Sequence, residues 1–174
     1  MTHWITHHNC GTPKNNREMM QEGLGRLVIA AWIVVTALGF LADAMAGQTV
    51  KMPSAKTLKV IYQAAKRYDV DAQALIKIAY LESSFKADAR RVNVNGTVDF
   101  GMFQVNSVHW TTTCKGLDVF SLKGNASCAA KLLSLAAKHA DVDPHWTGRY
   151  HSKTPTLKAA YAAKLASITL SERY

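Results

Sequence analysis

The stretch from residue 75 to residue 107 places the tightest limits on what this chain can fold into. Its first part predicts a helix, because Leu75, Ile78 and Ala79 recur at the spacing of one apolar stripe. Glu82 continues that stripe, so its carboxylate is expected to lie against the core. Burial penalises the charged form and raises the pKa of a carboxyl group, which can then donate a proton near neutral pH. The alternative is an exposed Glu at a fraying helix end, the ordinary location for this residue type.

A polar segment follows this helix and predicts a loop and a β-hairpin. Residues 86–99 contain the Asn95-Gly96 pair, which is a typical hairpin turn signal. The chain then tightens at Gly101, where we expect a backbone position that does not tolerate a Cβ.

Other segments from residue 54 onward carry helical patterns. Ser54 and Asp71 are predicted N-caps, and Pro155 is predicted in the first turn of a last helix, after Thr154 as its N-cap. We further expect a linker over 47–53, a short helix from 107 to 110, a helix over 123–139, a loop over 146–152, and a last helix over 155–168 whose stripe includes Tyr161. The sequence therefore predicts a mostly helical domain with one small β element.

The N-terminal part resembles a targeting segment. A charge-free run from Leu27 to Ala42 follows Arg26 and precedes the small-x-small signal Ala44-Met45-Ala46. The run is shorter than the ~20 residues that a membrane span needs. We expect a secretory signal peptide cleaved before Gly47, so that no stable membrane insertion remains; an uncleaved anchor is the alternative.

Residues 1–18 fit no part of a signal peptide, and Met19 or Met20 would give a leader of normal length if Met1 is not the start. We assign no function to the His and Cys residues of this segment, for which a metal site is the alternative. The expected organisation is an N-terminal extension with signal peptide over 1–46 and one periplasmic domain over 47–174.

The charge of the chain suits an anionic polymer. The formal net charge is +9, and it stays +9 without residues 1–46, which contain equal numbers of basic and acidic residues. A basic exported domain fits the cell wall. Nucleic acid is the competing partner, but the Lys and Arg residues form no dense run, so we expect no nucleic-acid binding.

Two cysteines, Cys114 and Cys128, remain after the expected cleavage. An even count in an oxidising compartment predicts one disulfide. Closing a loop of about 15 residues would contribute ~3 kcal/mol in the chain-entropy model. A catalytic thiol is the alternative, although no Cys-His signature surrounds either residue.

Three motifs resemble the lysozyme-like muramidase superfamily: Glu82-Ser83-x-Phe85, Asn95-Gly96 and Gly101-x-x-Gln104-x-Asn106. Two branches fit, the lytic transglycosylases (SLT domain) associated with conjugation, pilus and secretion systems, and the animal-type lysozymes. Animal-type lysozymes usually carry several disulfides, whereas this exported chain could form one, which favours the bacterial branch. The resemblance implies a mostly α (α+β) lysozyme-like fold with a small β-hairpin beside the catalytic helix.

The resemblance also implies a role for Glu82. As general acid, it would protonate the β-1,4 bridging oxygen between N-acetylmuramic acid and N-acetylglucosamine. In a transglycosylase the 6-hydroxyl of the muramic acid then attacks, Glu82 takes its proton, and a 1,6-anhydro sugar forms. This chemistry needs no cofactor, and no nucleotide loop or paired metal-ligand motif is visible in the sequence.

Asp99 stands at the spacing from Glu82 at which animal-type lysozymes keep their second carboxylate. It could act as nucleophile or cation stabiliser and permit hydrolysis. Transglycosylases of the secretion-linked branch can also carry an Asp here. The alternative from the residues alone is a hairpin Asp that bonds its own turn.

By resemblance, Gln104 and Asn106 line the substrate cleft, Ser83 orients the acid, and Tyr150 lies near the acid and positions it. Met102, Gln104 and Asn106 could instead form one face of a short strand. Lytic transglycosylases have a Tyr-Asn pair where this chain has Tyr150-His151, which leaves the role of His151 open.

The sequence thus predicts an exported peptidoglycan lytic transglycosylase that opens the wall locally for a conjugation, pilus or secretion apparatus. Its expected partners are peptidoglycan glycan strands and components of such a machine. The alternatives are a lysozyme using Glu82 and Asp99, a non-catalytic wall-binding assembly protein, and a basic nucleic-acid binder of the transfer machinery.

Overall fold

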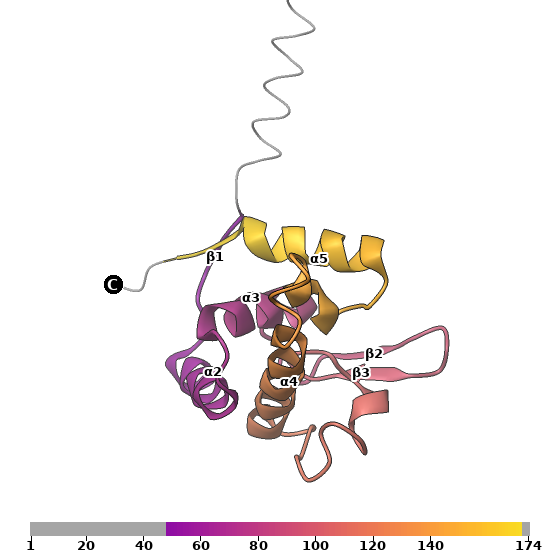
Figure 1. Ribbon diagram of the computed structural model, residues 1–174. Coiled ribbons are helices and arrows are strands. Elements are labelled where there is room, and N and C mark those ends of the chain that lie inside the picture. The colour runs from indigo at the N-terminus through magenta and orange to yellow at the C-terminus, as the bar shows by residue number, and fades with distance from the viewer. Residues whose placement is uncertain (1–47, 172–174) are drawn as a thin grey trace, which may run out of the picture. The chain divides into compact units, whose positions relative to one another are not determined.

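The computed structural model describes residues 48–171 (Figure 1). Its elements in chain order are β1 (Gln48–Val50), α2 (Ala55–Tyr68), α3 (Ala72–Ser83), β2 (Arg90–Val92), β3 (Val98–Phe100), β4 (Val105–Asn106), the 3₁₀ helix η1 (Ser107–His109), α4 (Leu122–Ala137), the 3₁₀ helix η2 (Trp146–Tyr150), α5 (Pro155–Ser167) and β5 (Ile168–Leu170). The predicted mostly α fold with small β elements is confirmed. The expected signal peptide and start positions lie outside the described residues.

The helix starts follow the predicted capping chemistry. The Ser54 hydroxyl accepts a hydrogen bond from the backbone N–H of Thr57 at 3.2 Å. The Asp71 carboxylate accepts from the first turn of α3 at 2.9 and 3.3 Å. Such caps satisfy N–H groups that have no partner within the helix and contribute ~1 kcal/mol each. Pro155 is the first residue of α5, but Thr154 makes no side-chain capping bond. None of the helices between residues 48 and 171 is long and apolar enough to cross a bilayer.

Helix α3 lies at the centre of the core. Leu75, Ile76, Ile78 and Ala79 are fully buried and pack between α2 and α5. Burying a Leu or Ile side chain stabilises a fold by about 1.5–3 kcal/mol. Because these residues hold α3 rigidly, the last turn of the helix, which carries Glu82, has a fixed position in the domain.

The polar segment after α3 forms a three-stranded antiparallel sheet in the order β2-β3-β4, and β2 and β3 extend to one side of the helices (Figure 1). Gly96 has a positive φ of 79° in the turn, as predicted for Asn95-Gly96. In this register Asp99 pairs with Arg91 on one side and with Asn106 on the other. Directly opposite residues point to the same face of a sheet, so these three polar side chains lie side by side.

Gly101 confirms the expected intolerance of a Cβ. Its φ is +78°, and a Cβ there would collide with the side chain of Asn125 in α4. That buried side chain donates to the carbonyls of Phe100 at 2.9 Å and Val119 at 3.1 Å, and accepts from the N–H of Phe103 at 3.0 Å. Asn125 therefore fastens the turn after β3 to the helical core.

Three local predictions were wrong or incomplete. The expected linker over 47–53 contains β1, which pairs in parallel with β5. Ile168 therefore begins a strand instead of ending the last helix. The expected loop over 146–152 contains η2. Segments of three to five residues are too short for a hydrophobic period to reveal, and their pairing depends on contacts distant in sequence.

The predicted disulfide between Cys114 and Cys128 is present. The two Cα atoms are 5.3 Å apart, within the range that the bond requires. It joins the irregular segment 110–121 to the buried face of α4, and both cysteines are inaccessible to solvent.

Candidate active site

A groove of about 420 Å³ runs between the small sheet, the end of α3 and the segment around η2. Its walls include five residues that the sequence analysis selected: Glu82, Asp99, Gln104, Asn106 and Tyr150. Ser83 is not among the lining residues. Within residues 48–171, no group of three His, Cys, Asp or Glu side chains is arranged to hold a metal ion.

Glu82 is half-buried in the last turn of α3. The Tyr161 hydroxyl donates a hydrogen bond of 2.6 Å to its Oε1 atom. Burial raises the pKa of Glu82 above its ordinary value, and the hydrogen bond from Tyr161 and the charge of Arg91 offset part of that rise. A carboxyl group in this environment can hold a proton at a higher pH than an exposed Glu and release it to a bound group.

Tyr161 is one site residue that the sequence analysis missed, and Arg91 is another. Tyr161 was assigned to the apolar stripe of α5, and it is indeed almost fully buried there. Burial, with the nearby Glu82 charge, raises the pKa of Tyr161, so its hydroxyl stays protonated and donates a hydrogen bond to the carboxylate. The His151 ring stacks on the Tyr161 ring with centroids 4.9 Å apart and planes within 1° of parallel. One signal was available: a buried tyrosine on an apolar stripe usually needs a partner for its hydroxyl.

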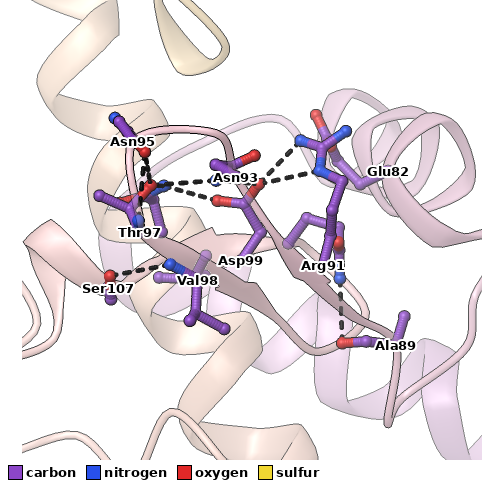
Figure 2. A network of polar contacts seen from close by, with 12 residues as sticks. Glu82, Ala89, Arg91, Asn93, Asn95, Thr97, Val98, Asp99 and Ser107 are labelled. Atoms are coloured by element: carbon purple, nitrogen blue, oxygen red, sulfur yellow. Dashed lines mark hydrogen bonds and ion pairs between the residues drawn. The ribbon is translucent and has the colours of Figure 1, made fainter.

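Asp99 lies in β3 inside a dense hydrogen-bond network (Figure 2). Its Oδ2 atom accepts from Arg91 Nη2 at 2.7 Å, Arg91 Nε at 3.2 Å and Asn93 Nδ2 at 3.0 Å. Its Oδ1 atom accepts from Asn106 Nδ2 at 2.7 Å. Burial alone would raise the pKa of Asp99, but these hydrogen bonds to its charged form outweigh burial and hold the pKa below the ordinary value.

The two carboxyl groups of the groove therefore have opposite environments. Glu82 favours its protonated form more than an ordinary Glu does, whereas Asp99 favours its ionised form. Pairs whose pKa values are pushed apart in this way can divide acid and anion roles between them. In Figure 2 the Arg91 guanidinium lies beside both groups; it bonds Asp99 directly and lowers the pKa of Glu82 through its charge.

The amides of Gln104 and Asn106 mainly organise the groove. Gln104 donates from Nε2 to the carbonyls of Ala89 at 3.0 Å and Gly101 at 2.9 Å, which leaves its amide oxygen for the groove. Asn106 donates to Asp99 and Thr97, and its amide oxygen accepts from the N–H of Val108 at 3.1 Å. Both line the groove as expected, and both direct their amide donors to groups within the protein.

Tyr150 lies in the groove near the acid, as expected, since burial and then the charge of Glu82 raise its pKa, but the hydroxyls of Tyr150 and Ser83 bond to other groups. The Tyr150 hydroxyl donates to the carbonyl of Phe103 at 2.8 Å and makes no hydrogen bond to Glu82. Tyr161 makes that contact instead. The Ser83 hydroxyl donates to the carbonyl of Met102 at 2.7 Å, so it ties the end of α3 to the turn after Gly101 and does not touch the carboxyl group. Met102 and Phe103 are buried in the core, as predicted.

Comparison with known proteins agrees with this geometry. The family model described as the transglycosylase SLT domain matches residues 59–165. The matched region begins in α2, ends in α5 and includes every residue that lines the groove. A search of curated proteins found no significant match to the chain. Since the matched region covers more than half of the sequence, and the helices and small sheet form a lysozyme-like fold, the chain belongs to the family of transglycosylase SLT domains.

Proposed function

We propose that this chain is a peptidoglycan lytic transglycosylase in which Glu82 serves first as general acid and then as general base. Membership of the SLT family indicates lytic-transglycosylase-type activity on peptidoglycan. The observation that carries the assignment to Glu82 is its half-buried carboxyl group of raised pKa, held by Tyr161 and facing the groove.

In the first step, protonated Glu82 donates its proton to the oxygen that joins C1 of N-acetylmuramic acid to N-acetylglucosamine. The C1–O bond breaks, the N-acetylglucosamine leaves with a hydroxyl group, and positive charge develops on the muramic acid ring. Tyr161 donates to Oε1 and stabilises the carboxylate that remains.

In the second step, the 6-hydroxyl oxygen of the same muramic acid attacks C1. The Glu82 carboxylate accepts the hydroxyl proton, so the enzyme returns to its starting protonation state. The product carries a 1,6-anhydro ring, and no water is consumed. General acid–base catalysis by one group in both steps explains why a second carboxylate nucleophile is not required.

Hydrolysis by a lysozyme mechanism is the second candidate, because Asp99 lines the same groove as Glu82. A nucleophilic carboxylate needs a free lone pair that can approach C1. The four hydrogen bonds to Asp99 occupy most of its acceptor capacity, and Arg91 balances its charge. This arrangement favours a structural and electrostatic role over attack, and hence transglycosylation over hydrolysis.

The variant Asp99→Asn is expected to keep anhydro products, because the attacking hydroxyl belongs to the substrate. Its rate should fall by less than the ~10²–10⁴-fold that a general acid–base group contributes. Mass spectrometry of muropeptides from wild-type and variant digests checks this, since anhydro ends and reducing ends differ by one water. Wild-type digests with reducing ends alone, together with an inactive Asp99→Asn protein, would establish hydrolysis. A folded wild-type protein that binds walls and releases neither product would establish the wall-binding alternative.

The variant Tyr161→Phe is expected to shift the pH profile of cleavage. Glu82 must be protonated for the first step, so activity is lost as pH rises through its pKa. The Tyr161 hydroxyl stabilises the charged form and lowers that pKa. Without the hydroxyl the pKa rises further, and the alkaline limb of kcat/KM moves to higher pH. A profile of kcat/KM against pH measures the shift, with Tyr62→Phe on the exposed face of α2 as the matched control. An alkaline limb that moves to lower pH would contradict the assignment.

We further propose that the domain is exported to the periplasm and acts beside a conjugation, pilus or secretion apparatus. The charge-free run ending in Ala44-Met45-Ala46 supports export, and the motif resemblance supports the machine. Such an apparatus must pass through the wall, which a compact domain can open locally. Loss of secretion, pilus assembly or plasmid transfer in a strain carrying Glu82→Gln would support this role.

The mature N-terminus is expected at Gly47, after cleavage of the small-x-small signal. N-terminal sequencing of the protein from a periplasmic fraction checks this expectation. Recovery of protein that still begins at Met1, Met19 or Met20 would reject cleavage.

A further inference from the structure

A second cavity, of about 490 Å³, adjoins the candidate active site. It shares four lining residues with the catalytic groove, namely His109, Leu132, Tyr150 and His151. The two hollows therefore lie side by side and share a wall, so a branch of a polymer bound in the groove has only this wall to cross to reach the second cavity. We call this second hollow the basic pocket.

Positively charged side chains line the basic pocket, and no carboxylate of the described residues does. The cations Lys138, Arg149 and Lys153 line it and do not line the groove, and the lining set contains neither Asp nor Glu. Arg149 forms an ion pair of 3.3 Å with Asp143. Within residues 48–171, the ammonium groups of Lys138 and Lys153 form no ion pair. Two lysine charges are thus left to attract an anion.

Two histidines that line the basic pocket, His109 and His151, have lowered pKa values. Burial, together with the charge of Lys153, lowers the pKa of His109. Burial and the charges of Arg91 and Lys164 lower the pKa of His151. At neutral pH the rings of His109 and His151 are therefore neutral hydrogen-bonding groups, and Lys138, Lys153 and Arg149 supply positive charge to the basic pocket.

One wall of the basic pocket is apolar. Leu132, Leu135 and Ala136 line it from one face of α4, and Leu135 is 41% exposed. The basic pocket thus combines surface for small methyl groups with cations for carboxylates. A ligand that suits both is a short peptide with alanine side chains and free carboxylates.

We propose that the basic pocket binds the stem peptide of peptidoglycan through its carboxylates while the glycan strand occupies the groove. The inference rests on the proposed function, because it assumes a peptidoglycan strand beside Glu82. Stem peptides branch from N-acetylmuramic acid, the sugar at which the bond breaks. They contain alanine residues and carry free carboxylates, which match the apolar wall and the two lysines. The shared wall between the basic pocket and the groove favours this ligand over an acidic protein segment or a lipid headgroup, because the stem branches from the sugar in the groove.

The test uses Lys138→Gln combined with Lys153→Gln, and a control pair, Lys56→Gln with Lys115→Gln. Both pairs remove two exposed lysine charges, and the control residues line neither hollow. Each protein digests glycan strands that keep their stems and strands from which an amidase has removed them. We expect wild type to show a higher kcat/KM on stem-bearing strands. The Lys138/Lys153 variant should lose roughly 3- to 10-fold on these strands, as two exposed ion pairs allow, with little change on bare strands.

Equal losses on both strands, or an equal effect of the control pair, would overturn the inference. So would a wild-type enzyme that cleaves both strands at the same kcat/KM, which would leave the proposed function intact. Failure of wild type to cleave either strand would instead reject the proposed function.

A binding measurement tests the basic pocket independently of cleavage. Free stem peptide is titrated into the wild-type protein and followed by NMR, with expected shifts in the backbone amides of 138–139 and 149–153. The amidated peptide should shift them much less. Absence of these shifts overturns the inference, and equal shifts with an unrelated acidic peptide would assign the basic pocket to an acidic protein segment.

Discussion

Replacing Glu82 by Gln is expected to abolish cleavage of peptidoglycan while the fold and wall binding are retained. Gln keeps the shape of Glu, and its amide oxygen can still accept the hydrogen bond from Tyr161, but it cannot deliver a proton. General acid–base groups typically contribute ~10²–10⁴-fold to the rate. Because Glu82 is proposed to act in both steps, the loss should reach or exceed the upper end of that range. Release of muropeptides from purified walls measures it.

The control for this variant is Asp88→Asn, which removes the same charge from an exposed position outside the groove. It should retain the wild-type rate. Thermal unfolding of both variants separates a catalytic loss from a folding defect. A folded Glu82→Gln protein that cleaves at the wild-type rate would reject both the transglycosylase and the lysozyme assignments, because both need the proton of Glu82.

Much of the secondary structure that positions this site could be predicted from local sequence. The apolar spacing of Leu75, Ile78 and Ala79 predicted a buried helix, and its stripe predicted that Glu82 would lie against the core. Asn95-Gly96 predicted the hairpin turn, and Gly101 the position where a Cβ does not fit. The helix stripe and the hairpin turn depend on residues close together in the chain, for which side-chain period and turn chemistry are sufficient. At Gly101 only the positive φ is local, because the clash of a Cβ involves Asn125 in α4.

The contacts that set the properties of the two carboxyl groups could not be predicted in this way. Tyr161 reaches Glu82 across 79 positions of the sequence, through the packing of α5 on α3. The hydrogen bonds from Arg91 and Asn106 to Asp99 depend on the strand register. A one-residue change in register would turn these side chains to the other face. Pattern alone therefore left the roles of Asp99 open, whereas the register brings four hydrogen bonds to its carboxylate, three of them to Oδ2.

The tyrosines near the acid illustrate the same limit. Resemblance pointed to Tyr150, which lies in the expected segment and lines the groove. Its hydroxyl instead supports the carbonyl of Phe103, and so fixes the turn that follows Gly101. The segment 146–152 therefore contributes to the site in two ways. Tyr150 supports the turn after Gly101. His151 stacks on Tyr161, whose hydroxyl donates to Glu82. Only the tertiary packing distinguishes the tyrosine that shapes the groove from the tyrosine that contacts the acid.

Removing the Cys114–Cys128 disulfide is expected to lower the free energy of unfolding by about 2–5 kcal/mol, the usual range for a small secreted domain. The bond closes a loop with a sequence separation of 14, and breaking it restores conformational freedom to the unfolded chain. Urea unfolding of the Cys114→Ala/Cys128→Ala protein, compared with oxidised wild type, measures the loss. Free-thiol labelling of the unfolded, unreduced protein comprising residues 47–174 should find no thiol, and two labelled cysteines would reject the pairing.

Reduced wild-type protein is the matched control, because it keeps both buried sulfur atoms and loses the cross-link alone. Its loss of stability reports the cross-link, and any further loss in the Ala variant reports the small cavity left in the core. Neither cysteine lines the groove, so either protein, once folded, should still give the wild-type product class. A product that changed from anhydro to reducing ends would show that segment 110–121 shapes the active site directly.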